Sequence, residues 1–97
     1  MELKASDRLM VSPEVLSQEV GGETVLLDLR SDFYFGLDEI GTRVWQLLQS
    51  GLSLQELIDM MLDEYEVKRE TLEADVGELL DKLLAAHLVS IDSLPPS

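Results

Sequence analysis

The sequence predicts an α+β domain in which an antiparallel β-meander of three strands precedes three helices. Two observations support this prediction: apolar residues recur at every second position before about Asp38, and they recur with a helical period of about 3.6 residues after it. The chain has 97 residues, which is the length of one small domain. We therefore expect a single domain over residues 1–97, with its core within about residues 10–91 and a flexible tail over residues 92–97.

Three short segments before Asp38 have the pattern of strands. The first runs from Val15 to Val20 and ends at Gly21-Gly22, a pair that tolerates the positive φ angles of a hairpin turn. The second, Thr24 to Leu29, alternates as a strand with one buried face does. The apolar residues that share one side of this second segment are Val25, Leu27 and Leu29. The third segment, Phe33 to Leu37, follows a polar turn, so the three strands form a meander.

The first two helices have recognisable start signals. Asp38 is placed to cap the first helix, which we expect to end at Gly51. Ser53 and Glu56 have the spacing of a capping box at the start of the second helix. Trp45 is expected in the core between the first helix and the sheet, and its exposure as a contact for a partner enzyme is the alternative.

The third helix is predicted from Thr71, as its cap, to about Ala86 or His87. Its apolar residues cover an arc of about 140°, which is wider than one packing seam requires. A short extended piece over residues 88–91 follows it. The predicted architecture is therefore similar to a winged helix-turn-helix, with the sheet packed on three helices.

Composition argues against several classes of function. Asp and Glu (20) outnumber Lys and Arg (7), and the net charge of −13 disfavours binding to nucleic acid or to an anionic membrane. The chain has no cysteine and no long apolar run, so we expect a cytoplasmic protein. His87 is the single histidine, without an evident set of catalytic partners, and Asp59 and Asp63 lack the spacing of a calcium loop. We therefore expect no enzymatic activity, no metal and no cofactor.

The third strand and the third helix are the features that core packing leaves unexplained. Phe33 to Leu37 comes last in the meander, so it is expected to be an edge with unpaired backbone groups. If this edge lies beside the broad apolar face of the third helix, the two frame a groove that suits β-augmentation by a peptide. Three alternatives stay open: the strand and helix pack only on each other, the edge pairs with a second copy of the chain, or the domain is a winged-helix regulator that acts through proteins.

Residues 34–48 read Tyr-Phe-Gly-Leu-Asp-Glu-Ile-Gly-Thr-Arg-Val-Trp-Gln-Leu-Leu. This stretch resembles the Tyr-x-x-Leu-Asn-x-x-Gly-x-x-Ile-Trp-x-Leu-Leu pattern of the PqqD-like family, with Asp38 in place of the common Asn. Leu83 to Val89 matches the closing Leu-x-x-x-x-Leu-Val of the family, and the resemblance covers about residues 10–91. Members of this family are recognition elements for ribosomally synthesised, post-translationally modified peptides.

The resemblance implies a domain without catalysis that holds the leader peptide of a precursor. In the family the leader adds as a fourth strand beside the third strand and rests against the third helix. Carried over by position, the strand contacts are those of Asp32, Phe33, Tyr34 and Phe35. The side chains that would line the hydrophobic pockets are Val76, Leu79, Leu80 and Leu83. The electrostatic contacts expected for a basic leader are those of Asp75 and Glu78.

Within the family, the chain looks most like the separate leader-binding proteins of lasso peptide biosynthesis. The resemblance then implies a leader with a Tyr-x-x-Pro motif, and as partners a separate cysteine leader peptidase and a macrolactam synthetase. Members that act on the precursor of pyrroloquinoline quinone (PQQ), beside a radical SAM enzyme, are the alternative branch. Those members typically carry Leu-Tyr-Pro-Glu-Gly where this chain has Leu27 to Ser31.

Overall fold

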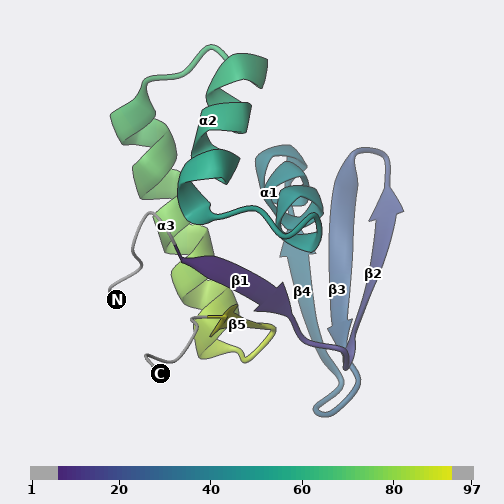
Figure 1. Ribbon diagram of the computed structural model, residues 1–97. Helices are drawn as coiled ribbons and strands as arrows, with labels where there is room; N and C mark the ends of the chain where they lie inside the picture. The colour runs from purple at the N-terminus through teal and green to yellow at the C-terminus, as the bar shows by residue number, and fades with distance from the viewer. Residues whose placement is uncertain (1–6, 93–97) are drawn as a thin grey trace, which may run out of the picture.

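The structure, a computed structural model, describes residues 7–92 and contains, within that range, two small sheets and three helices (Figure 1). The elements are β1 (Arg8–Val11), β2 (Val15–Val20), β3 (Glu23–Asp28), β4 (Phe33–Leu37), α1 (Glu39–Gln49), α2 (Leu54–Glu64), α3 (Arg69–Ala85) and β5 (Val89–Asp92). The predicted α+β class, with a three-stranded antiparallel sheet followed by three helices, is confirmed. The predicted tail begins at Asp92, which closes β5, and its remainder at 93–97 lies outside the described residues.

The larger sheet has the order β2-β3-β4, with both pairs antiparallel. The β2–β3 hairpin turns through Gly21 and Gly22, whose φ angles of 62° and 86° favour glycine. The face of β3 that packs on the core is that of Thr24, Leu26 and Asp28, and the apolar side with Val25 and Leu29 faces outward instead. The face of β3 that is buried is therefore the one that the helices cover, and not the one with more apolar residues.

The smaller sheet pairs β1 with β5, so it joins the two ends of the described chain. β5 agrees with the predicted extended piece, but β1 was not predicted. In β1 only Leu9 is buried, and its neighbours Arg8 and Met10 are exposed, so the segment is too short and too mixed for a periodic signal. The backbone amide of Ser12 also donates to the carbonyl oxygen of Leu88, at 2.9 Å, and extends the contact.

Helix α1 lies between the larger sheet and the α2–α3 pair, as Figure 1 shows. Its buried face carries Trp45, only 2% exposed, which confirms the core position expected from the sequence. The other large side chains of the core come from all three helices and from both sheets. They include Leu26, Leu37, Val44, Leu57, Met61, Val76, Leu80, Leu83 and Leu88.

Two of the three predicted helix caps are confirmed. The Asp38 carboxylate accepts a 2.8 Å hydrogen bond from the Gly41 amide, and Ser53 forms a reciprocal capping box with Glu56. The prediction that Thr71 caps the third helix is wrong, because α3 begins at Arg69. Lys68 occupies the N-cap position without a side-chain hydrogen bond, and the half-exposed Arg69 forms ion pairs with Asp59 of α2 and Glu73 of α3. Within residues 7–92, no helix combines the length and apolarity needed to cross a membrane.

Candidate peptide-binding site

The edge of the larger sheet is the starting point of the site. β4 pairs with β3 on one side, and on its other side it pairs with no strand among residues 7–92. The backbone N–H and C=O groups on that side are a template on which a further strand can add. The edge predicted from the order of the strands is therefore present.

A hollow of about 480 Å³ lies between this edge, the first turns of α1 and the side of α3. We call it the β4–α3 hollow. Its wall from β4 and the start of α1 consists of Phe35, Gly36, Leu37, Asp38, Ile40, Gly41 and Val44. Its wall from α3 consists of Asp75, Val76, Glu78, Leu79 and Lys82. The hollow thus has the edge of β4 along one wall, and along the other the apolar side chains of Val76 and Leu79 among charged residues.

Five of the residues predicted for the site lie around this hollow. Phe35 contributes from β4, and Val76 and Leu79 contribute from α3. Val76 is almost fully buried, whereas Leu79 is partly exposed and so presents more surface to the hollow. Asp75 and Glu78 stand at its rim and are exposed. The structure thus brings the predicted strand and helix together at this place.

The other predicted residues lie elsewhere. Leu80 and Leu83 are fully buried in the core, with exposed fractions of 0%, and do not line the hollow. Phe33 and Tyr34 belong to β4 but are exposed by 47% and 67% at its first half, outside the hollow. Asp32 precedes β4 in a turn, with a φ of 58°. The backbone of residues 32–34 lies along the same edge, and the side chains of Phe33 and Tyr34 are exposed there.

Seven lining residues were not predicted as part of the site: Gly36, Leu37, Asp38, Ile40, Gly41, Val44 and Lys82. Lys82 follows Asp75, Glu78 and Leu79 at helical spacing, so the sequence did carry a signal for its position. Gly41 acts by its small size. A Cβ atom at Gly41 would lie 3.3 Å from Leu37 Cβ, so the glycine allows the first turn of α1 to approach the end of β4 closely.

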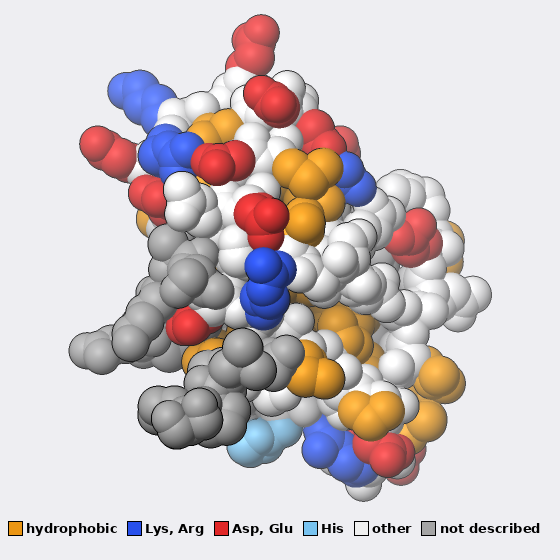
Figure 2. All heavy atoms as spheres, viewed as in Figure 1, with side chains coloured by type: hydrophobic (Ala, Val, Ile, Leu, Met, Phe, Trp, Pro, Cys, Tyr) orange, Lys and Arg blue, Asp and Glu red, His pale blue; other side chains and the backbone are white. Residues whose placement is uncertain are grey.

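The rim of the hollow is acidic. Asp38, Asp75 and Glu78 contribute carboxylates, and Lys82 contributes the single opposing charge among the lining residues. The Lys82 ammonium lies 3.5 Å from the Glu78 carboxylate, and both side chains are largely exposed. Figure 2 shows acidic side chains spread over the upper part of one face, in keeping with the net charge of −13. The site therefore attracts cationic groups over neutral or anionic ones.

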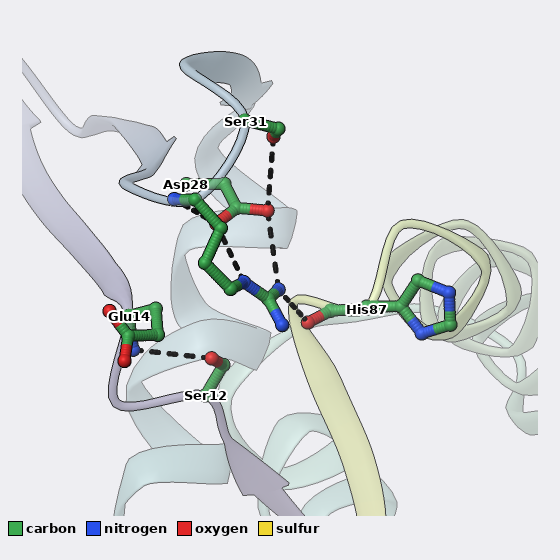
Figure 3. Close-up of polar contacts among 6 residues, drawn as sticks. Ser12, Glu14, Asp28, Ser31 and His87 are labelled. Carbon is green, nitrogen blue, oxygen red and sulfur yellow. Dashed lines mark hydrogen bonds and ion pairs between the residues drawn. The ribbon is translucent and has the colours of Figure 1, made fainter.

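A cluster of hydrogen bonds at the lower end of β3 fixes the two walls relative to each other (Figure 3). The Arg30 guanidinium donates to both oxygens of the buried Asp28 carboxylate, at 3.0 and 3.2 Å, and to the carbonyl oxygen of His87, at 2.8 Å. The Ser31 hydroxyl also donates to Asp28. These hydrogen bonds, those from Arg30 first, hold the pKa of the Asp28 carboxyl below its ordinary value.

The features of the hollow suit the binding of an extended peptide. Among residues 7–92, no three His, Asp or Glu side chains gather closely enough to hold a metal ion. The His87 side chain is exposed beyond the end of α3, and only its backbone carbonyl takes part in the contacts described above. What the hollow presents is an unpaired strand edge, the apolar side chains of Val76 and Leu79, and an acidic rim.

Comparison with known proteins gives a family and two solved structures. The model of the family described as Coenzyme PQQ synthesis protein D (PqqD) matches residues 23–89. No curated protein sequence matches the chain significantly. The matched range begins at β3 and ends in β5, so it contains both walls of the β4–α3 hollow.

The two similar structures are both complexes with peptides. One is described as TbiB1 in complex with the TbiA(beta) leader peptide: it is 36% identical, has a TM-score of 0.76, and the match covers 89% of this chain and 98% of that one. The other is described as lasso peptide synthetase B1 complexed with the leader peptide: it is 28% identical, has a TM-score of 0.77, and the match covers 86% of this chain and 98% of that one.

Proposed function

Because the chain belongs to the family of coenzyme PQQ synthesis protein D, we propose that it binds the leader peptide of a ribosomally synthesised precursor, in lasso peptide biosynthesis. The observation that carries this proposal is the unpaired edge of β4 beside the β4–α3 hollow. Both solved structures similar to this chain are complexes with leader peptides. The PQQ branch, with a radical SAM enzyme as partner, has no comparable support among the structures that match.

The leader adds to β4 as a fourth strand of the larger sheet. Its backbone pairs with the free edge, and alternate side chains turn toward the hollow, because successive residues of a strand point to opposite faces. Leu79 is the partly exposed leucine of the α3 wall, so it provides the apolar contact. The acidic rim favours a leader that carries Lys or Arg near the paired segment.

The role that follows is positional, without chemistry of the domain's own. A bound leader keeps the rest of the precursor close to a leader peptidase and a macrolactam synthetase, and so raises its effective concentration there. These two enzymes are the partners that we propose, with the cytoplasm as the place of action. The flexible part of the precursor stays free to enter their active sites.

The test is a fluorescence-polarisation titration with the labelled leader peptide encoded beside the gene. Leu79→Ala should weaken binding about tenfold, because the substitution removes apolar contact surface from the hollow. Leu84→Ala is the matched control, since Leu84 is also a partly buried leucine of α3 but does not line the hollow. Equal affinities of the two variants would refute the placement of the peptide.

Failure of the wild-type chain to bind any leader would refute the function itself. In that case the next experiment is sedimentation velocity, which measures whether the chain forms a dimer. A dimer that forms with rising protein concentration would favour the alternative in which the β4 edge pairs with a second copy of the chain.

A further inference from the structure

The outer face of the larger sheet has a gap at its edge. Thr24, Leu26 and Asp28 of β3 face the core, so their register partners on β4 do too. The residues between them, Tyr34 and Gly36, consequently point to the outer face. Gly36 has no side chain, so the outer face is open between Tyr34 and the end of the strand.

A second hollow of about 490 Å³ lies at this gap. We call it the Gly36 hollow. It is bounded by Gly36 at the edge, by Val25 beside it in the same row of the ladder, and by Val20 of β2. Val20 and Val25 are exposed by 63% and 43%, so their apolar surface is uncovered. The hollow shares Gly36, Leu37 and Asp38 with the β4–α3 hollow, and the two therefore meet across the same stretch of β4.

We propose that the Gly36 hollow is a second subsite, which takes one large apolar side chain, best an aromatic one, from the bound leader. This inference rests on the proposed function. A strand added beside β4 has one residue in line with Val25 and Gly36, and its side chain lies on the same face as theirs. Over a glycine, that side chain can lie flat across the sheet and cover the neighbouring strand, as aromatic residues do beside glycines at sheet edges.

The surroundings of the hollow decide the class of this side chain. Its floor and far wall are the valines, which favour apolar contact, and Tyr34 flanks it two positions away on the same face. Its polar rim contains the carboxylates of Glu23 and Asp38, so an Asp or Glu of the leader is repelled there. Leader recognition thus uses both faces of the added strand: one side chain over Gly36, and its neighbours against α3.

The glycine also allows a clean test. A Cβ atom at Gly36 meets no atom within 4 Å, and its φ lies outside the range that disfavours other residues. A leucine at this strand position is therefore tolerated by the fold and fills the gap itself. Gly77 of α3 is the matched control, because a Cβ atom there also meets nothing within 4 Å and Gly77 lines neither hollow.

The experiment titrates Gly36→Leu, Gly36→Ala and Gly77→Leu with the labelled leader peptide, and with a set of peptides in which each large apolar residue is replaced by alanine. Gly36→Leu should weaken binding about tenfold, which corresponds to about 1.4 kcal/mol, and Gly36→Ala much less. Gly77→Leu should bind as the wild type does. One of the alanine peptides should bind the wild-type protein about tenfold more weakly than the unmodified leader does. The same peptide and the unmodified leader should bind Gly36→Leu with equal affinity.

Affinity of Gly36→Leu within twofold of the wild type would overturn the subsite, as would full additivity between Gly36→Leu and every alanine peptide. Val25→Ser gives the same test by removing the floor of the hollow, and it decides the matter if Gly36→Leu fails to fold by circular dichroism. If the wild type binds no leader at all, the proposed function fails first. If the wild type binds the leader and the Gly36 and Val25 variants bind it with unchanged affinity, the subsite alone fails.

Discussion

Arg30 and His87, which are 57 positions apart in the sequence, are joined by a 2.8 Å hydrogen bond from Arg30 Nη2 to the His87 carbonyl oxygen. The bond links the turn before β4 to a residue two positions past the end of α3. His87 has a φ of 61°, and this left-handed conformation belongs to the reversal of the chain after the helix. The two walls of the β4–α3 hollow are thus held at their lower end by a direct contact.

Replacing Arg30 by methionine should loosen this contact. The aliphatic stem is kept, but the hydrogen bonds to Asp28 and to His87 are lost, and the Asp28 carboxylate is left buried without its cation. We expect a lower urea midpoint and a weaker affinity for the leader. Arg8→Met is the control, because Arg8 also donates to a carbonyl oxygen and a carboxylate, at Gly51 and Glu56, and does not line the hollow. An Arg30 variant that loses stability but keeps full affinity would show that the contact does not shape the site.

The stability of the domain should depend on Asp28 at low pH. The pKa of the Asp28 carboxyl is lowered in the folded chain, first by the hydrogen bond from the Arg30 side chain. The stabilisation is therefore complete above the unfolded pKa of about 4 and is lost as the pH falls through the lower folded pKa. The urea midpoint of the wild type should exceed that of Asp28→Asn at pH 7, and the difference should shrink below about pH 4. A constant difference between pH 7 and pH 3 would contradict this.

Adjacent leucines on α3 should behave differently when truncated. Leu80 is fully buried, and we expect Leu80→Ala to cost about 3 kcal/mol in the free energy of unfolding, the usual range for such cavities. Leu79→Ala should cost less, because Leu79 is partly exposed and belongs to the wall of the hollow. Urea unfolding of both variants, followed by circular dichroism, measures the difference. Similar losses would mean that Leu79 is as much a part of the core as Leu80.

The acidic rim should act through long-range attraction. Asp75→Asn and Glu78→Gln should each weaken the binding of a leader that carries Lys or Arg, by roughly twofold to fourfold at low salt. The loss should fade as the ionic strength rises, since exposed charges are screened. Asp81→Asn is the control on the same helix, because Asp81 is exposed and lines no part of the hollow. If all three substitutions weakened leader binding equally, the net charge of the domain alone would explain the effect, and not the position of the rim.

Much of the fold could be predicted from local patterns. The double glycine at 21–22, the Asp38 cap and the Ser53–Glu56 capping box each act over a few residues, and the structure contains all three. The start of α3 was misplaced because its N-cap is Lys68, which makes no side-chain capping hydrogen bond and so gives no local signal. β1 was missed because it is only four residues long and its partner strand is at the opposite end of the described chain.

For the site, the sequence indicated the strand and the helix that frame the hollow, but it identified only some of the side chains that line it. The broad apolar arc of α3 does not distinguish Leu79, which faces the hollow, from Leu80, which faces the core. That distinction depends on how α3 is rotated against α1 and the sheet, which no local pattern specifies. Gly36 was unremarkable in the sequence, because an absent side chain gains meaning only once its neighbours across the sheet are known.

The pairing of β1 with β5 also bears on how the domain comes to be folded during synthesis. Arg8 lies opposite Asp92, and β5 is the only ladder partner of β1 among residues 7–92. β1 therefore gains its ladder only after β5 has been made, and until then its strand-like pairing within the described residues is limited to the isolated bridge between Arg8 and Ser53. Closing so long a loop also carries an entropic cost before the ladder forms. The meander of β2 to β4 has no such delay, since each of its strands pairs with its neighbour in sequence. The β4 edge therefore takes shape through pairing between neighbouring strands, independently of the ladder that ties the two ends of the described chain together.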